Sequence, residues 1–262
     1  MFFKRKPQLQ PLSDIPVRTT RDKDNPSLTG MALLSSDRLV VGDRDNRSVM
    51  LFDVVQDEVL HQLEVDSTPL SVCSLPGTRA AVALPFDNTI LILDCDNELS
   101  IDNRITVREE LQELGYSNGH LIVLYGFGKI EKLHMNGAVV RQTNLETSSL
   151  HIYQPLSVMT KGNVTSIYVG DYDNRRILRL DEDLQEQQVY PLPRDNVPWS
   201  VLAVGENQLL VSDRNNRLWQ LDSTMGRWTR LKKIEFDSMA FCHNRHVLYC
   251  GVHDAVKRYA IS

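Results

Sequence analysis

The sequence predicts an all-β fold, a six-bladed β-propeller, and three observations lead to this prediction. A phrase built on Asp, Asn and Arg recurs along the chain, a second phrase built on Ser precedes several of its copies, and the recurrence has a nearly constant period. A period of about 40 residues is typical of propeller blades, each of which is a four-stranded sheet. We therefore expect a single propeller domain spanning residues 1–262.

The first phrase joins two apolar strands through a polar turn. Its first clear copy is Leu39-Val-Val-Gly-Asp43-Arg-Asp-Asn46-Arg47-Ser-Val-Met-Leu-Phe-Asp53, two further clear copies cover 167–181 and 209–222, and weaker copies cover 80–94, 121–134 and 247–260. The six copies close at residues 53, 94, 134, 181, 222 and 260, which are 41, 40, 47, 41 and 38 residues apart. The chain therefore contains six units of blade length.

The second phrase marks the innermost strand of a unit. It occurs as Pro69-Leu-Ser71-Val72, Pro155-Leu-Ser157-Val158 and Pro198-Trp-Ser200-Val201, with a degenerate copy at Asp237-Ser238-Met239. Inner strands should be almost wholly apolar, because neighbouring blades bury both of their faces. The equivalent positions are indeed apolar, and they predict an apolar central channel: Met31, Val72, Val158, Val201 and Met239. In the third unit, the segment 108–114 is compatible with either a helical turn or an inner strand.

The predicted ring has defined unit boundaries and a defined closure. We expect blades at about 28–66, 67–107, 108–147, 148–193, 194–234 and 235–262. The last unit lacks an outer strand, while residues 9–20 form a strand without a partner near the N-terminus. Pairing of that segment with the last unit would close the ring and remove exposed sheet edges.

Composition and charge exclude several classes of protein. The chain is 42% hydrophobic and 24% charged, with a formal charge of −5, so it is neither disordered nor strongly basic. Its longest apolar runs are five residues, too short for a membrane span, and we expect no signal peptide. The four cysteines (Cys73, Cys95, Cys242 and Cys250) show no metal or disulfide spacing, which indicates reduced thiols and a cytoplasmic location.

The repeated Asp, Asn and Arg residues predict a structural role. We expect each aspartate to accept backbone N–H groups of the turn that follows it and to pair with the arginine four positions on. A calcium loop is the alternative, but Arg47 and Arg175 stand where a ligand is needed, so we expect no metal and no cofactor. The residues given this structural role are Asp43, Asn46, Arg47, Asp171, Asn174, Arg175, Asp213, Asn216 and Arg217.

These turn phrases resemble NHL repeats. The best example is Asp171-Tyr-Asp-Asn174-Arg-Arg176-Ile177, and further phrases, among them Pro-Trp199-Ser-Val and Asn136-Gly137, resemble the C-terminal propeller of tripartite-motif (TRIM) proteins, particularly their divergent invertebrate forms. In that family the propeller recognises protein or RNA, and a RING domain elsewhere in the chain performs ubiquitin transfer. The resemblance implies a recognition module without catalytic activity of its own. No RING, B-box or coiled-coil pattern occurs in this sequence.

The ligand should bind where the loops surround the mouth of the channel. The residues predicted to form this binding face are Arg44, Phe86, Phe127, Tyr172, Trp199, Arg214 and His253, with Leu70 and Leu156 in neighbouring connections. Large aromatic side chains at loop tips favour a protein partner, and the alternative is RNA, which the family also binds. A metal-dependent hydrolase or lyase is a remote alternative, because no catalytic motif is present and the predicted channel is apolar. We expect no membrane association and an isolated domain that is monomeric.

Overall fold

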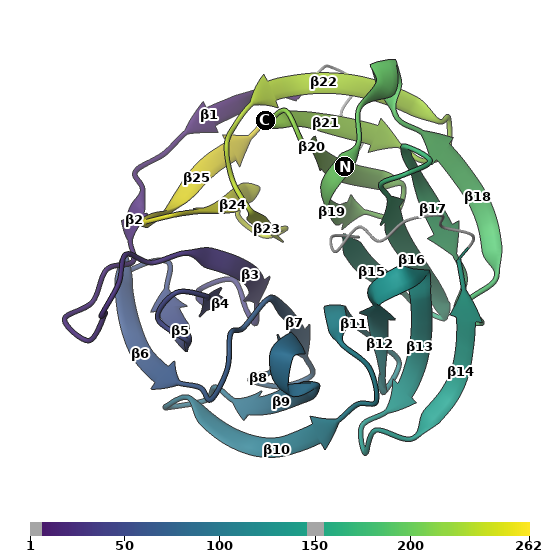
Figure 1. Ribbon diagram of the computed structural model, residues 1–262. Coiled ribbons are helices and arrows are strands. Elements are labelled where there is room, and N and C mark those ends of the chain that lie inside the picture. Colours follow the sequence, from purple (N-terminus) through teal and green to yellow (C-terminus); the bar gives the residue numbers. More distant parts are fainter. Residues whose placement is uncertain (1–6, 146–154) are drawn as a thin grey trace.

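The computed structural model describes residues 7–145 and 155–262, and Figure 1 shows them as six sheets arranged in a ring around a central space. Neighbouring strands within every sheet are antiparallel, and each sheet is built almost entirely from strands that are consecutive in the chain. This is the predicted six-bladed β-propeller.

Each of the first five blades has four strands in chain order, from the centre of the ring outward. Blade one consists of β3 (Leu28–Leu33), β4 (Arg38–Asp43), β5 (Ser48–Asp53) and β6 (Glu58–Glu64). Blade two consists of β7 (Ser71–Leu75), β8 (Arg79–Leu84), β9 (Thr89–Asp94) and β10 (Ser100–Thr106). Blade three consists of β11 (Leu111–Ser117), β12 (His120–Tyr125), β13 (Lys129–His134) and β14 (Val139–Asn144).

The remaining blades follow the same plan, with one exception at the ends of the chain. Blade four consists of β15 (Leu156–Lys161), β16 (Val164–Asp171), β17 (Arg176–Leu180) and β18 (Glu186–Pro191). Blade five consists of β19 (Pro198–Gly205), β20 (Gln208–Asp213), β21 (Arg217–Asp222) and β22 (Arg227–Lys233). Blade six has β23 (Ser238–Cys242), β24 (Val247–Val252) and β25 (Ala255–Ile261), and an N-terminal segment completes it. The predicted boundary between the third and fourth units, at 147 and 148, lies outside the described residues.

The hydrophobic core lies between the blades. Strand β12 shows the principle: Leu121, Val123 and Tyr125 pack in a cluster with blade two, whereas Ile122 and Leu124 pack in a cluster with blade four. Successive residues of a strand point to opposite faces, so a strand buried on both faces must be apolar throughout. Six such clusters, one at each interface between neighbouring blades, hold the described residues together.

The third unit begins with a strand and not with a helical turn. Strand β11 covers Leu111–Ser117 and pairs with β12, but its register shifts between Leu111 and Glu113. Such a β-bulge inserts a residue, bends the strand and re-aims the side chains beside it.

The N-terminal segment closes the ring, as predicted. Strands β1 (Leu9–Pro11) and β2 (Ile15–Pro16) both pair with β25, and Figure 1 shows β1 lying outside β25. The single strand expected over 9–20 is therefore two short ones. Because proline has no N–H to donate, Pro11 and Pro16 are tolerated on this outer edge but do not favour a longer ladder.

Two further features of the described residues concern the class of protein. All four cysteines are free, and only Cys73 is even partly exposed. The described residues contain no helix with the length and apolar character that crossing a bilayer requires.

Candidate functional site

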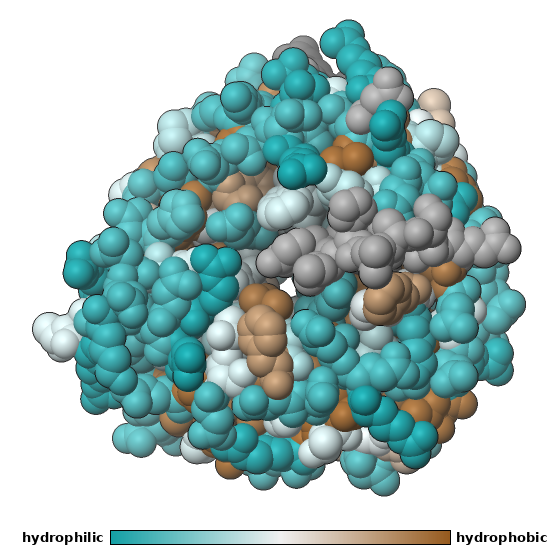
Figure 2. All heavy atoms as spheres, viewed as in Figure 1, coloured by the Kyte–Doolittle hydropathy of each residue, from teal (hydrophilic) through white to brown (hydrophobic). Residues whose placement is uncertain are grey.

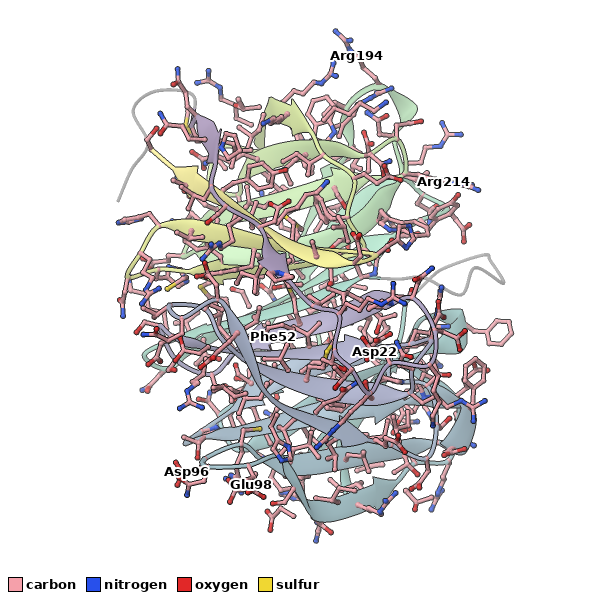
Figure 3. The ribbon with its side chains drawn as sticks, turned by 90° about the vertical axis from the view of Figure 1, so that its left-hand side faces the viewer. Asp22, Phe52, Asp96, Glu98, Arg194 and Arg214 are labelled. Atoms are coloured by element: carbon pink, nitrogen blue, oxygen red, sulfur yellow. The ribbon has the colours of Figure 1, made fainter. Side chains whose placement is uncertain are left out.

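The connections between second and third strands, together with the connections between blades, form one end of the ring, which we call the loop face. The predicted binding residues come from these connections. Figure 3 shows Arg214, from the β20–β21 connection, on the opposite side of the molecule from Asp96 and Glu98, which belong to the β9–β10 turn. The opposite end of the ring carries the turns between first and second strands and between third and fourth strands.

Two phenylalanines project from the loop face of neighbouring blades. Phe86 lies in the 3₁₀ turn η1 (Pro85–Asp87) between β8 and β9, and Phe127 lies in the turn η2 (Gly126–Gly128) between β12 and β13. Their relative exposures are 69% and 70%, so neither folds inward to cap the core. In Figure 2 hydrophobic side chains stand out on this face among mostly hydrophilic residues. Large exposed aromatic side chains of this kind mark interaction sites.

Four other predicted residues are brought together on blades four to six. Trp199, Arg214 and His253 line one pocket between blades five and six, with a volume of about 180 Å³. The Arg214 guanidinium donates a 2.5 Å hydrogen bond to the Tyr172 hydroxyl and lies 6.0 Å from the centre of the Tyr172 ring. Three residues of this pocket, Glu235, Phe236 and Asp237, were not predicted, because only a degenerate copy of the second phrase, beginning at Asp237, marks the connection that carries them.

Arg44 does not line the pocket, but its charge acts on the pocket residue Asp237. Arg44 lies on blade one, where its Nε atom donates a 2.9 Å hydrogen bond to the carboxylate of its exposed neighbour Asp45. The seven predicted residues thus fall into an aromatic pair on blades two and three, a polar pocket on blades four to six, and a single arginine on blade one.

The recurring aspartates organise the turns that carry these side chains. Asp43 is fully buried and accepts hydrogen bonds from the Ser27 N–H at 2.9 Å and from the Asn46 side-chain amide at 2.8 Å. Asn46 in turn uses its side-chain oxygen to accept the N–H groups of Lys23 and Asp24, each at 2.9 Å. The first copy therefore fixes both its own turn and the N-terminal segment that runs past it.

The other two aspartates use different partners. Asp171 accepts the Asn174 N–H at 3.1 Å and the Asn174 side-chain amide at 2.8 Å. Asp213 accepts the backbone N–H of Asn215 at 2.8 Å and the indole N–H of Trp219 at 2.9 Å. In all three copies a buried carboxylate accepts hydrogen bonds that shape its turn, and in the first and third copies it also satisfies a buried donor, the Ser27 N–H and the Trp219 indole N–H.

The expected ion pair between each aspartate and the arginine four positions on is wrong: the structure shows it in none of the three copies, which all lie within the described residues. Asp171 pairs with Arg176, five positions on, at 2.7 Å, because Arg175 takes a left-handed backbone with φ of 54°. Arg217 directs its guanidinium to the Asn196 side-chain oxygen, 3.1 Å away. In the first copy, Arg47 has φ of 47° and its backbone N–H bonds to the Arg44 carbonyl.

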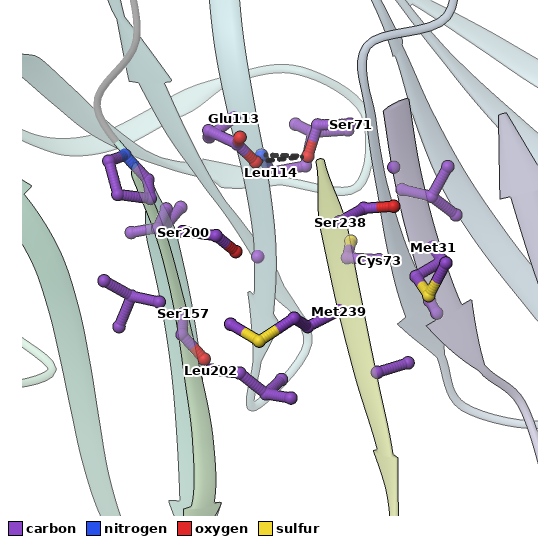
Figure 4. Close-up of a pocket in the computed structure, with 18 of the residues that line it drawn as sticks. Met31, Ser71, Cys73, Glu113, Leu114, Ser157, Ser200, Leu202, Ser238 and Met239 are labelled. Carbon is purple, nitrogen blue, oxygen red and sulfur yellow. Dashed lines mark hydrogen bonds between the residues drawn. The ribbon is translucent and has the colours of Figure 1, made fainter. Parts of the chain in front are cut away.

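The central channel is not purely apolar, which corrects the expectation. The apolar residues predicted to line it do so, but Glu113 of β11 lines the same cavity of about 270 Å³. Its carboxylate accepts a 2.6 Å hydrogen bond from the Ser71 hydroxyl, and Figure 4 shows the two side chains joined across the channel wall. The sequence did contain a sign of this polar character, namely the serine that recurs in the second phrase. Ser71, Ser157 and Ser200 all line the cavity.

The channel and the pocket between blades five and six are neighbours, because Trp199 and Asp237 line both. Figure 2 shows the loop face hollowed near its centre. A ligand on the loop face could therefore extend a side chain into the channel.

Some cations on the loop face are paired with carboxylates, whereas Arg214 and Arg217 contact neutral groups. Lys129 lies 2.6 Å from the Glu109 carboxylate and 2.9 Å from the Glu131 carboxylate, and these contacts raise the pKa of Lys129 above its ordinary value. Arg176 and Arg44 each pair with an aspartate. Within residues 7–145 and 155–262, no group of three or more His, Cys, Asp or Glu side chains is arranged to hold a metal ion.

Comparison with known proteins gives no relative. No protein-family model matches the chain, and no curated protein matches it in sequence. The resemblance to NHL repeats and TRIM propellers therefore remains a prediction.

Proposed function

We propose that this propeller is a recognition module that binds a protein partner through its loop face, without catalytic activity of its own. The observation that carries the proposal is the pair Phe86 and Phe127, which project from equivalent turns of neighbouring blades and are each about two-thirds exposed. Exposed aromatic side chains on a rigid scaffold are the usual anchors of protein interfaces.

The distribution of charge supports a protein ligand over RNA. Binding of RNA depends on cations that neutralise phosphates and on stacking platforms for bases. On this face Lys129 and Arg176 are paired with carboxylates, which lowers the positive charge available to a phosphate backbone. Arg214 and Arg217 contact neutral groups and keep their charge unmatched by these contacts. The two phenylalanines could stack on bases, and the experiment below therefore includes an RNA arm.

The resemblance to TRIM propellers suggests the wider context. By that analogy the module would select substrates for a ubiquitin ligase whose catalytic RING lies in another domain or chain. We place it in the cytoplasm, in line with the four free cysteines of the chain.

The test is affinity capture from a cytosolic extract with three proteins: the wild type, a Phe86→Ser/Phe127→Ser variant and a control variant. The control is Val164→Ser/Met225→Ser, which changes two similarly exposed apolar residues at the opposite end of the ring, one at the start of β16 and one in the β21–β22 turn. Each capture is divided into an arm with ribonuclease and an arm without it. All three proteins are first shown to unfold at similar urea concentrations.

The proposal predicts protein partners that survive ribonuclease, remain with the control and fall at least tenfold with the phenylalanine variant. Partners or RNA that are lost with ribonuclease, and whose binding falls steeply with added salt, would favour an RNA-binding propeller instead. Equal capture by all three proteins would show that the loop face of blades two and three is not the binding site.

A further inference from the structure

The carboxylate of Glu113 faces the channel because of an irregularity in its strand. The register of β11 against β12 shifts between Leu111 and Glu113, so the regular alternation of side chains between neighbouring blades is interrupted there. Glu113 then meets Ser71 of blade two, whose hydroxyl donates to Oε2 at 2.6 Å and accepts the Leu114 N–H at 3.1 Å. The carboxylate is held in a defined position by a residue of another blade.

This carboxylate has no positive partner. In the part of the chain that the structure describes, no Lys, Arg or His nitrogen lies within ion-pair distance of Glu113, and burial raises its pKa to about 7. Glu131 of the same blade makes a useful contrast. Glu131 is buried, whereas Glu113 is half-buried, and Glu131 receives Lys129 at 2.9 Å and the Tyr125 hydroxyl at 2.8 Å. An enclosed carboxylate without such partners is costly, and a cation from outside would relieve that cost.

The cavity around Glu113 suits an alkyl chain that ends in a charged group. Its walls combine hydroxyls with flexible apolar side chains, and Figure 4 shows Ser200, Met239 and Leu202 facing the same space as Glu113. The volume of about 270 Å³ is many times what one water molecule needs. Methionine and leucine would cover methylene groups, while the hydroxyls would accept further hydrogen bonds.

The geometry favours an ammonium over a guanidinium. A guanidinium binds best through two parallel hydrogen bonds to both oxygens of a carboxylate. Oε2 of Glu113 already accepts the Ser71 hydroxyl, so one of the two oxygens that a guanidinium would need is already engaged. An ammonium is a compact charge with three donors, and it can bond to Oε1 and to nearby hydroxyls together.

We propose that the channel binds an alkylammonium group, which Glu113 receives and Ser71 helps to position. The group would be either the side chain of a lysine on the protein partner or a free diamine. Only the first source rests on the proposed function, because a free diamine would bind whether or not the phenylalanines hold a partner.

Three other titratable groups line the cavity. Cys73 of β7 stays neutral because burial raises its pKa to about 12, and the second group is the phenol of Tyr116 of β11. Asp237 lines both the cavity and the neighbouring pocket, and its residue is exposed. Partial desolvation of its carboxyl group raises its pKa, and the charges of His253 and Arg44 act in the opposite direction. Asp237 is therefore the competing anion, and it must be tested beside Glu113.

The test is calorimetric titration of the full chain with two probes, cadaverine and Nα-acetyl-lysine methylamide, beside Nα-acetyl-norleucine methylamide, which lacks the ammonium. We expect saturable binding of at least one ammonium probe and none of the norleucine probe. Affinity should fall about tenfold between pH 8 and pH 6, because a carboxyl with a pKa near 7 is then mostly protonated. Glu113→Gln should abolish binding, while Glu110→Gln, at an exposed position of the same segment, and Asp237→Asn should retain it.

Each result decides one point. Binding of cadaverine alone identifies a free diamine as the ligand, and binding of the lysine probe identifies a lysine side chain. No binding to the wild type at about 10 mM probe, equal binding to Glu113→Gln, or loss with Asp237→Asn alone would overturn the proposal. Failure of the phenylalanine variants to lose a partner would overturn the proposed function and leave this result unaffected.

Discussion

Arg258 of the last strand pairs with Asp57 in the β5–β6 turn of blade one through two contacts, Nη1 to Oδ1 at 2.7 Å and Nη2 to Oδ2 at 3.0 Å. The same guanidinium donates to the Ser13 carbonyl at 2.6 Å and to the Val54 carbonyl at 3.2 Å. One side chain thus joins the C-terminal strand, the N-terminal segment and the first blade. The ring is closed without a covalent link inside blade six, where the N-terminal strands β1 and β2 pair with the C-terminal strand β25, and Arg258 stabilises the place where the two ends of the chain meet.

Replacement of Arg258 should therefore weaken closure of the ring. The Arg258 side chain is only 11% exposed, and its loss leaves two backbone carbonyls and a carboxylate without their donor. We expect Arg258→Ala to lower the free energy of unfolding by about 2 kcal/mol, with Arg258→Lys recovering only part of this because an ammonium cannot make the bidentate contact. Urea unfolding measures both. The exposed Arg227 on β22 is the control, and a similar loss from Arg227→Ala would contradict the assigned role.

Removal of the repeated aspartate of blade five should lower the free energy of unfolding more than removal of an aspartate with similar turn contacts at the other end of the ring. Asp213 is fully buried and accepts the N–H groups of Asn215 and Arg217 and the indole N–H of Trp219. Asp213→Ala leaves these donors without an acceptor, and we expect a loss of about 3 kcal/mol in the free energy of unfolding.

The comparison for this prediction is Asp222, a half-buried residue that accepts the N–H groups of Thr224 and Met225 in the β21–β22 turn. Asp222→Ala should cost about 1 kcal/mol, because water can replace the carboxylate there. Urea titration of both variants measures the difference. Equal losses would mean that burial of the repeated aspartate adds nothing to its role.

The blades could be predicted because their requirements are local and recur. Apolar runs such as Leu121–Tyr125 are needed wherever a strand is buried on both faces, and the turn phrases return with the period of a blade. The inner strand of blade three was ambiguous because Gln112 and Glu113 interrupt its apolar pattern. What stabilises Glu113 there is Ser71, 42 residues earlier in the chain, and a contact of that range leaves no local signal.

The site could be predicted only as a set of loop residues. Their placement on one face follows from the propeller plan, but their grouping depends on how each turn is shaped. The choice of Arg176 over Arg175 as the partner of Asp171 is set by the left-handed backbone at Arg175. The position of an arginine within the repeated phrase does not reveal which of two adjacent arginines will pair with the aspartate.

Stability should depend on pH through Glu113. Burial raises its pKa from 4.5 to about 7, so the folded state binds a proton more tightly than the unfolded state. The stabilising contribution of that proton is fully present below about pH 4.5 and is lost as the pH rises through 7. Glu113→Gln keeps the shape of the neutral form without the titration. Its advantage in free energy of unfolding over the wild type should therefore grow by about 2 kcal/mol from pH 5 to pH 8.

Urea unfolding at the two pH values tests this, with Glu110→Gln as the control at an exposed position. The control should keep a nearly constant difference from the wild type. If Glu113→Gln also kept a constant difference, the carboxyl of Glu113 would have the same pKa in the folded and unfolded states, and the channel would solvate it fully.

Replacement by glycine should change the free energy of unfolding in opposite directions at the two exposed phenylalanines. Phe127 has a left-handed backbone (φ 61°, ψ 22°), which is strained for a residue with a bulky side chain, whereas Phe86 is not among the residues with positive φ. Both side chains project into water, so deleting either one removes little packing. Phe127→Gly should raise the free energy of unfolding by about 1 kcal/mol through relief of strain. Phe86→Gly should lower it by about 0.5–1 kcal/mol, because glycine gains conformational freedom in the unfolded chain.

Thermal unfolding of the two variants measures this pair of effects, and partner capture measures their functional counterpart. If Phe127 anchors a partner, Phe127→Gly is more stable than the wild type and binds less well, so the strained backbone is retained for recognition and not for folding. If Phe127→Gly destabilised the protein as much as Phe86→Gly, the left-handed turn would carry no strain. The exposure of Phe127 would then be the only property that distinguishes it as a binding residue.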